Sequence, residues 1–295
     1  MENQALRQRA EEIGRDRDRG AAELLALTLP LLAEALASGR ETTLEVVRTI
    51  CGGQPAMAPL WNACGAAMSD ASQPGRFARV RAEMERAAAA LVRAAGAALD
   101  EALGDERSPH LLTLSFSSSV ARVLGAVAAH RPLRVTCGEG RPRYEGRRMA
   151  TELASSRIDV TLTTDAALTV RLSSATAVIV GADAFRPSAW INKVGTRGLA
   201  AAASLAGVPT FVICTRDKAR PGAPHAEALV DGPPEEVWDT PPPGVGLSNP
   251  YFEDTPAELA TLFLMESGRV SPDDLESVCA RYSADILNLQ QVLAQ

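Results

Sequence analysis

Residues 111–137 are LLTLSFSSSVARVLGAVAAHRPLRVTC, and they hold the clearest structural signal in the chain. An apolar, β-rich run at Leu111–Ser115 is followed by a helix-like run at about 118–129 and a second β-rich run at Leu133–Cys137. Strand, helix and strand at this spacing are typical of a βαβ unit, whose two strands are parallel. This stretch therefore predicts part of a parallel sheet.

The same alternation continues toward the C-terminus. Helix-like stretches at about 145–156, 165–172 and 192–206 separate three more β-rich runs, which are Ile158–Thr163, Thr176–Gly181 and Pro209–Cys214. Helices would then cover both faces of the sheet. Ligands of such sheets bind beyond the carboxyl ends of the strands, so the residues after each strand are the candidate site residues.

The chain before the sheet has a different character. Residues 1–107 are rich in Ala, Leu, Glu and Arg, with apolar positions at helical spacing, and Gly/Pro clusters at 52–55 and 74–75 interrupt the pattern. We expect four or five helices, with the charged run at 7–19 as the solvated face of the first. The predicted domains are 1–107, helical, and 108–295, which holds the sheet and binds the ligand.

The last third is less regular. Residues 215–250 contain eight of the 19 prolines and predict a long irregular connection. Helix is expected again at about 256–267, and a last helix at about 272–293, with Ser271 as its cap and Pro272 in its first position.

Composition excludes several classes of protein. With 295 residues there is room for one large or two modest domains, and 46% hydrophobic residues argue against wholesale disorder. The net charge of −6 argues against a protein whose bulk field attracts nucleic acid or anionic membrane. Aromatic residues make up only 4%, so an extended base-stacking surface is not expected.

The cysteines and the N-terminus favour a cytoplasmic protein. The five cysteines are odd in number and form no C-x-x-C pair, and the three histidines are scattered, so we expect reduced thiols, no metal and no cofactor. The N-terminus lacks the apolar core of a signal peptide. The apolar stretch Leu24–Ala33 is short and contains Pro30, so no membrane span is expected.

Two strand ends carry candidate site residues. The strand VIV at 178–180 ends in Gly181, Ala182 and Asp183, which makes Asp183 a candidate general base or an acceptor for a ligand hydroxyl. The alternative is a loop carboxylate that binds backbone amides. Further along, Asn192 suits a helix N-cap and Lys193 follows it, which together predict an anion pocket. The alternative there is an ordinary cap beside a solvated lysine.

Two other strand ends are also candidates. Arg141, in the turn CGEGRP at 137–142, is a candidate for gripping a phosphate, or else an exposed arginine of an ordinary turn. The hydroxyls at 113–119, which include Ser115, are suited to cradle an anion or simply to cap the next helix.

Together these motifs resemble one family: the alpha, beta and delta subunits of eukaryotic initiation factor 2B and the related sugar-phosphate isomerases. The resemblance extends from about Val46 to Gly268 through GGQPAMAPL, LLTLSFSSSVARVL, EGRPRYEGRRMATEL, IDVTLTTDAA, AVIVGADAF, INKVGTRGLAAAASLAGVPTFV and NPYFEDTPAELATLFLMESG. It implies an α/β fold, in which a helical N-terminal domain precedes a Rossmann-like parallel-sheet domain that usually dimerises. It also implies a crevice for a phosphorylated ribose or a nucleotide.

The resemblance leaves two functions open. The family's isomerases act on methylthioribose-1-phosphate or ribose-1,5-bisphosphate with a Cys at the end of the first strand and an Asp in the GAD turn. Here Asp183 matches the Asp, but Ser115 stands at the Cys position, and an alcohol is a far weaker acid than a thiol. The strand-end thiols Cys137 and Cys214 are an alternative source of an acid. Gln54 stands where the enzymes have Arg, and Glu145 where Gln is usual.

Ser115 and Gln54 favour a protein like the initiation-factor subunits, which binds a phosphorylated ribose or nucleoside monophosphate without established catalysis. Asp183, Asn192 and Lys193 favour the alternative, an aldose–ketose isomerase of a ribose phosphate. The expected partners are a small phosphorylated ligand, a second copy of the chain in a homodimer and, by resemblance, other proteins; nucleic acid and membrane are not expected.

Overall fold

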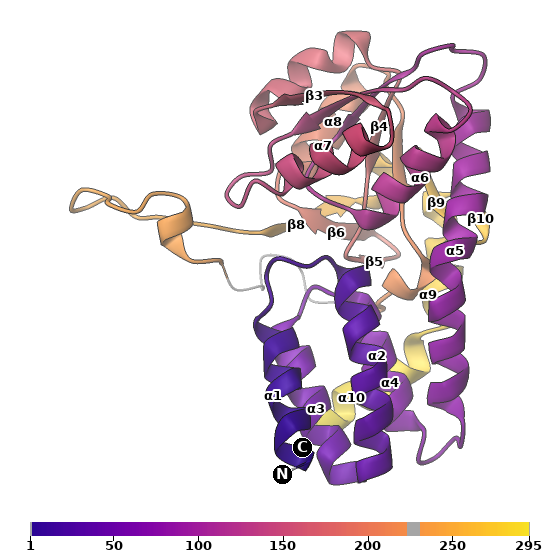
Figure 1. Cartoon of the computed structure of the whole chain (residues 1–295), viewed down its shortest axis with the longest axis vertical. Coiled ribbons are helices and arrows are strands. Elements are labelled where there is room, and N and C mark those ends of the chain that lie inside the picture. The colour runs from indigo at the N-terminus through magenta and orange to yellow at the C-terminus, as the bar shows by residue number, and fades with distance from the viewer. Residues whose placement is uncertain (1, 223–230, 295) are drawn as a thin grey trace.

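A computed structural model describes residues 2–222 and 231–294. Its N-terminal part is helical, and Figure 1 shows most of these helices below the sheet, whereas the last and longest runs upward beside it. As expected, there are five: α1 (Glu2–Arg15), α2 (Ala21–Ser38), α3 (Arg40–Gly53), α4 (Ala58–Ser69) and α5 (Arg76–Ala102).

Close backbone contact holds the first helices together. A Cβ added to Gly53 would lie only 2.4 Å from the Cα atom of Gly14, so α1 and α3 touch where neither residue has a side chain. By length and composition alone, α2 is the one helix in the described ranges able to cross a membrane. Its apolar residues pack in the helical core, however, Leu24, Leu31 and Leu32 being fully buried.

The sheet has seven strands in the order β10-β9-β7-β4-β1-β2-β3, all parallel except the edge strand β10. The α/β fold with a parallel sheet after the helices is confirmed, and each predicted run forms a strand. The strands are β1 (His110–Thr113), β2 (Arg134–Gly138), β3 (Asp159–Thr163), β4 (Ala177–Val180), β7 (Thr210–Ile213), β9 (Leu262–Met265) and β10 (Gly268–Val270).

A second, three-stranded antiparallel sheet lies beside the first and corrects one expectation. It consists of β5 (Ala184–Arg186), β6 (Ala189–Lys193) and β8 (Phe252–Pro256). Asn192 is therefore not a helix N-cap, because it lies on β6 and pairs with Glu253 of β8. The helix α8 (Thr196–Leu205) begins only after Gly195, whose φ of 100° turns the chain out of the strand.

The other helices follow the prediction in part. The helices α6 (Ser118–Ala128) and α7 (Glu145–Ser155) lie where expected, and 165–174 is a 3₁₀ helix, η1 (Asp165–Ser174). The prediction of a helix at 256–267 is wrong. The apolar run LFLM in this stretch forms strand β9, which pairs with β7 in the main sheet. The expected last helix is interrupted: a 3₁₀ turn, η6 (Pro272–Asp274), precedes α9 (Leu275–Ala280) and α10 (Ser283–Leu293).

Two helices connect the parts of the molecule. The first half of α5 packs in the helical core through Phe77, and its second half runs beside the sheet (Figure 1) and packs against it through Leu91 and Leu99. At the other end of the chain, α10 returns to α4, where a Cβ on Gly65 would lie 2.9 Å from the carbonyl oxygen of Asp285. The division of the chain at residue 107 stays a prediction.

The proline-rich connection is largely irregular. Residues 231–250 extend away from the body of the molecule in Figure 1, and most of their side chains are exposed, including Trp238. Within the connection, residues 216–218 form a 3₁₀ turn, η2 (Arg216–Lys218), in which Asp217 and Lys218 are buried. Residues 223–230 of the predicted connection lie outside the described residues.

Candidate functional site

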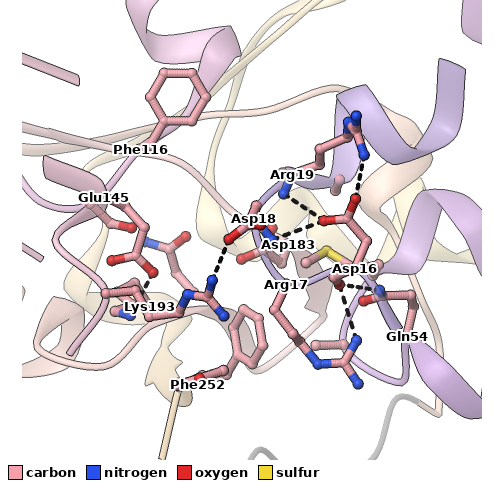
Figure 2. Close-up of a pocket in the computed structure, with 18 of the residues that line it drawn as sticks. Asp16, Arg17, Asp18, Arg19, Gln54, Phe116, Glu145, Asp183, Lys193 and Phe252 are labelled. Atoms are coloured by element: carbon pink, nitrogen blue, oxygen red, sulfur yellow. Dashed lines mark hydrogen bonds and ion pairs between the residues drawn. The ribbon is translucent and has the colours of Figure 1, made fainter. Parts of the chain in front are cut away.

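A cavity of about 720 Å³ opens between the helical part and the carboxyl ends of the strands. One wall comes from the ends of β1 and β4 and from β6, and the other from the α1–α2 loop and the turn before α4. Figure 2 shows the loop residues Asp16–Arg19 on one side and Glu145 with Lys193 on the other, with Asp183 between them. Of the predicted site residues, Ser115, Asp183, Asn192 and Lys193 line this cavity.

Asp183 is held in place by its backbone while its carboxyl stays available. Its N–H donates to the carbonyl of Ile191 at 2.8 Å, and its own carbonyl accepts from the N–H of Ala58 at 3.1 Å. In the described ranges, its carboxyl has no hydrogen-bond partner. Burial raises the pKa of this carboxyl, while the charges of Lys218 and Lys193 oppose the rise. Asp183 is thus suited to exchange a proton with a ligand.

Lys193 is buried and paired, so it is not a solvated lysine. Its Nζ lies 2.8 Å from Oε1 of Glu145 and 5.2 Å from the ring centroid of Tyr251. The second carboxylate oxygen of Glu145 is buried without a partner in the described part of the chain. The pairing explains how a carboxylate is tolerated at an anion pocket, because Lys193 neutralises it.

Lys218 also lines the cavity, although the strand-end motifs did not predict it. It lies on η2, four residues beyond the strand-end Cys214, and its ammonium group donates to the carbonyl of Ala182, beside Asp183. It is 6% exposed and lines the cavity. Lys218 follows a strand end, where ligand-binding residues are expected. The many prolines of residues 215–250 predicted only an irregular connection there.

Ser115 is placed at the cavity by an unusual backbone conformation. Its φ is 65°, in the left-handed region that is uncommon outside glycine, and such residues cluster at functional sites. The nearby hydroxyl of Ser117 caps α6 by accepting from the N–H of Val120. Neither Cys137 nor Cys214 lines the cavity, and burial raises the pKa of Cys137 to about 12. These two thiols therefore do not replace the missing cysteine.

Arg141 does not reach the cavity. Its guanidinium donates to the hydroxyl of Tyr144 at 2.9 Å and to the carbonyls of Glu236 and Val237 at 3.1 and 3.2 Å, which fastens the proline-rich segment. Arg143, two residues further on, lines the cavity instead and pairs with Asp18 of the α1–α2 loop. The N-terminus of α8, expected to hold an anion, also lies outside the lining.

The α1–α2 loop forms the opposite wall, although its charged run was expected to be solvated helix surface. α1 ends at Arg15, and the carboxylate of Asp16 then accepts the backbone N–H groups of Asp18 and Arg19, at 2.8 and 2.9 Å. The amide of Gln54 donates to the carbonyls of Ile13 and Asp16, at 2.8 and 2.6 Å. Gln54 therefore shapes this wall by fixing the loop.

The electrostatics of the cavity differ from those of the whole chain. Six basic and five acidic side chains line it, although the chain has a net charge of −6. Arg17 and Arg19 stand beside the N-terminus of α2, whose helix dipole also favours an anion. In the described ranges, no group of three or more His, Cys, Asp or Glu is arranged to hold a metal.

The sequence model of the initiation factor 2 subunit family matches residues 15–272. The chain belongs to this family. It is 36% identical over 187 residues to methylthioribose-1-phosphate isomerase of Heliobacterium modesticaldum, an alignment that covers 58% of this chain and 52% of the relative. It is 32% identical over 149 residues to ribose 1,5-bisphosphate isomerase of Archaeoglobus fulgidus, covering 48% and 47%. The chain thus spans about half the length of these curated relatives.

Solved structures confirm the fold. The translation initiation factor eIF-2B of Pyrococcus horikoshii superposes with a TM-score of 0.76 at 23% identity, covering 91% of this chain and 97% of that one. The 5-methylthioribose 1-phosphate isomerase of the same organism gives a TM-score of 0.68 at 19% identity, covering 94% and 87%. The match to the sequence model confirms the predicted family, and the two solved structures share this architecture.

Proposed function

We propose that this chain is an aldose–ketose isomerase of a phosphorylated ribose. The observation that carries the proposal is the Asp183 carboxyl, which is partly buried, lines the cavity beside two lysines and is free of protein hydrogen bonds in the described part of the chain. The sequence relatives named above are isomerases of such sugars, which supports the same reaction class.

Aldose–ketose isomerisation moves a hydrogen between C2 and C1 and needs groups that accept and return protons. Nothing is added or lost overall, so no cofactor is required by the chemistry. Burial raises the pKa of Asp183 above that of an ordinary aspartate, which favours its role as a group that exchanges protons. Lys193 and Lys218 provide positive charge where a sugar oxygen becomes negative, and the arginines of the opposite wall attract the phosphate.

A second function remains a candidate because of one observation: the residue at the thiol position is Ser115. An alcohol gives up its proton far less readily than a thiol. A protein that binds a phosphorylated ribose or nucleoside monophosphate, without rapid turnover, is then the alternative. Asn192, whose amide donates to Thr196 at 2.9 Å and whose side chain lines the cavity, serves either function as a binding residue.

The test is conversion of three sugar phosphates, followed by NMR: methylthioribose-1-phosphate, ribose-1,5-bisphosphate and 5-deoxyribose-1-phosphate. Turnover of one of them by the unmodified chain, lost in Asp183→Asn, supports the isomerase. Binding detected by calorimetry without conversion overturns the isomerase and supports the binding protein. We further propose a homodimer, to be checked by light scattering of the purified chain, in which a monomer mass would contradict it.

A further inference from the structure

The helix α4 contacts the candidate site twice, at positions one helical turn apart. The N–H of Ala58 donates to the carbonyl of Asp183 at 3.1 Å. Four residues later, the amide group of Asn62 donates to the carbonyls of Asp217 and Ala219, at 2.6 and 2.7 Å. Residues i and i+4 lie on the same face of a helix, so one face of α4 touches both contact points.

The two carbonyls that Asn62 binds flank Lys218. The side chain of Asn62 is 2% exposed, and it crosses from the helical part of the molecule to η2. Lys218 lies between these two bonded carbonyls, and its ammonium group donates a hydrogen bond to the carbonyl of Ala182. Asn62 thus determines where the backbone that carries this lysine lies.

The N–H of Arg220, just after η2, donates to the carbonyl of Phe185 at 2.8 Å and holds the end of the turn, whereas another side of the turn is open. A second cavity, of about 360 Å³, borders the turn on that side and is lined by Asn62, Arg216 and Asp217 among others. The second anchor of the turn is Glu266, whose carboxylate accepts the backbone N–H and the Nε of Arg216, at 3.0 and 2.9 Å. Because this side of the turn faces a cavity, it is held there by hydrogen bonds rather than by packing.

The side-chain amide of Asn62 also has an unfavourable feature. Its oxygen is buried with no hydrogen-bond partner in the described ranges, which is unfavourable. A leucine of similar size would bury no such acceptor. The amide therefore stabilises the structure only through its two donated bonds to η2.

We propose that Asn62 is a positioning residue, which holds Lys218 beside Asp183 from the helical part of the molecule. The role in catalysis rests on the proposed function, whereas the role in geometry does not. When η2 is released, Lys218 withdraws and Asp183 loses a favourable charge. The other charged groups that face Asp183 are Lys193 and Glu145, and loss of the Asn62 hydrogen bonds is expected to leave both in place.

The charge of Lys218 lowers the pKa of Asp183 and so opposes the effect of burial. Loss of the Asn62 bonds is therefore expected to move the titration of Asp183 to higher pH. The experiment is a ¹³C NMR titration of the Asp183 carboxyl in the free, full-length chain, with Asp183→Asn used to assign the signal. It needs no substrate.

Three variants and one control make this test specific. Asn62→Ala and Asn62→Leu both remove the donors, but only alanine leaves a hole, so both are expected to move the midpoint upward. Lys218→Met is expected to move it in the same direction and further. The control is Asn288→Ala, whose amide donates to Ser69 of the same helix at 3.0 Å, away from η2, and it is expected to leave the midpoint unchanged.

A midpoint unchanged in both Asn62 variants overturns the proposal, as does a shift in Asn62→Ala alone or an equal shift in Asn288→Ala. Should Asn62→Ala fail to fold, Asn62→Leu decides by the same measurement. Where the unmodified chain converts ribose-1,5-bisphosphate, the Asn62 variants are expected to lose about 10-fold in kcat, with KM changed much less. If the unmodified chain converts no sugar phosphate, the proposed function fails, yet the titration still decides the role of Asn62.

Discussion

The two walls of the cavity are built by different means. On the sheet side, the main-chain hydrogen bonds of β1, β4 and β6 place Ser115, Asp183 and Lys193. On the helical side, the α1–α2 loop is placed by side-chain bonds, those of Asp16 and Gln54 above all. The sheet wall carries Asp183, the proposed proton-exchanging group, and the helical wall carries most of the arginines, so changes in the two walls are expected to affect different steps.

The largest expected effect is on the sheet wall. Asp183→Asn keeps the size of the side chain but removes the proton exchange, so turnover of ribose-1,5-bisphosphate is expected to fall about 10²- to 10⁴-fold. Affinity measured by calorimetry should stay nearly unchanged, because the phosphate is attracted from the opposite wall. Asp159→Asn, on the exposed edge strand β3, is the matched control. Equal losses in both variants would contradict the role of Asp183.

The next effect is a gain on the same wall. Ser115→Cys restores the thiol that the family's isomerases use, and it is expected to raise the rate of isomerisation, by up to about 10²-fold. The gain should disappear in the double variant Ser115→Cys/Asp183→Asn. Rates are followed by NMR with methylthioribose-1-phosphate and ribose-1,5-bisphosphate. Rapid turnover by the unmodified chain would instead show that the hydroxyl of Ser115, or another group, suffices.

The helical wall is expected to affect binding. Gln54→Ala removes two short bonds, to the carbonyls of Ile13 and Asp16, and frees the loop that carries Arg17 and Arg19. With about 1 kcal/mol for each bond, affinity for ribose-1,5-bisphosphate should fall by up to about 30-fold, with kcat changed less. Calorimetry and saturation kinetics measure the two quantities. A loss in kcat alone would contradict the assignment of ligand binding to the helical wall and of turnover to the sheet wall.

The difference between the two walls also explains which site residues could be predicted from the sequence. The strand-end residues Ser115, Asp183 and Lys193 were found because apolar strands of a parallel sheet place their carboxyl ends at one edge. Arg141 was assigned from the same rule, yet the side chain turns toward Glu236 and Val237, and strand position alone does not give side-chain direction. Asn192 was expected to cap a helix because its pairing with β8, some sixty residues later in the chain, leaves no local signal.

The residues missed altogether act through long-range contacts. The loop of Asp16 becomes a cavity wall only because Gln54, far along the chain, binds it. Lys218 reaches Asp183 because Asn62, on another helix, holds the turn that carries it. Local composition predicted a solvated helix face and an irregular connection at these two places, because hydrogen bonds between distant segments have no periodicity to detect.

The smallest expected effect lies at the opposite end of the sheet wall. His110 begins β1, away from the cavity, and its ring contacts Thr136 at 2.8 Å and the carbonyl of Ser174 at 3.2 Å. Burial lowers its pKa, so the unfolded chain binds a proton before the folded chain does. The stability that this residue contributes is therefore present above the unfolded pKa of about 6.5 and is lost as the pH falls through the folded value. Urea denaturation at pH 7.5 and pH 5.5 measures the free energy of unfolding at each pH. This free energy is expected to fall less between the two pH values in His110→Gln than in the unmodified chain. Equal losses would mean that other groups control the acid sensitivity of the sheet.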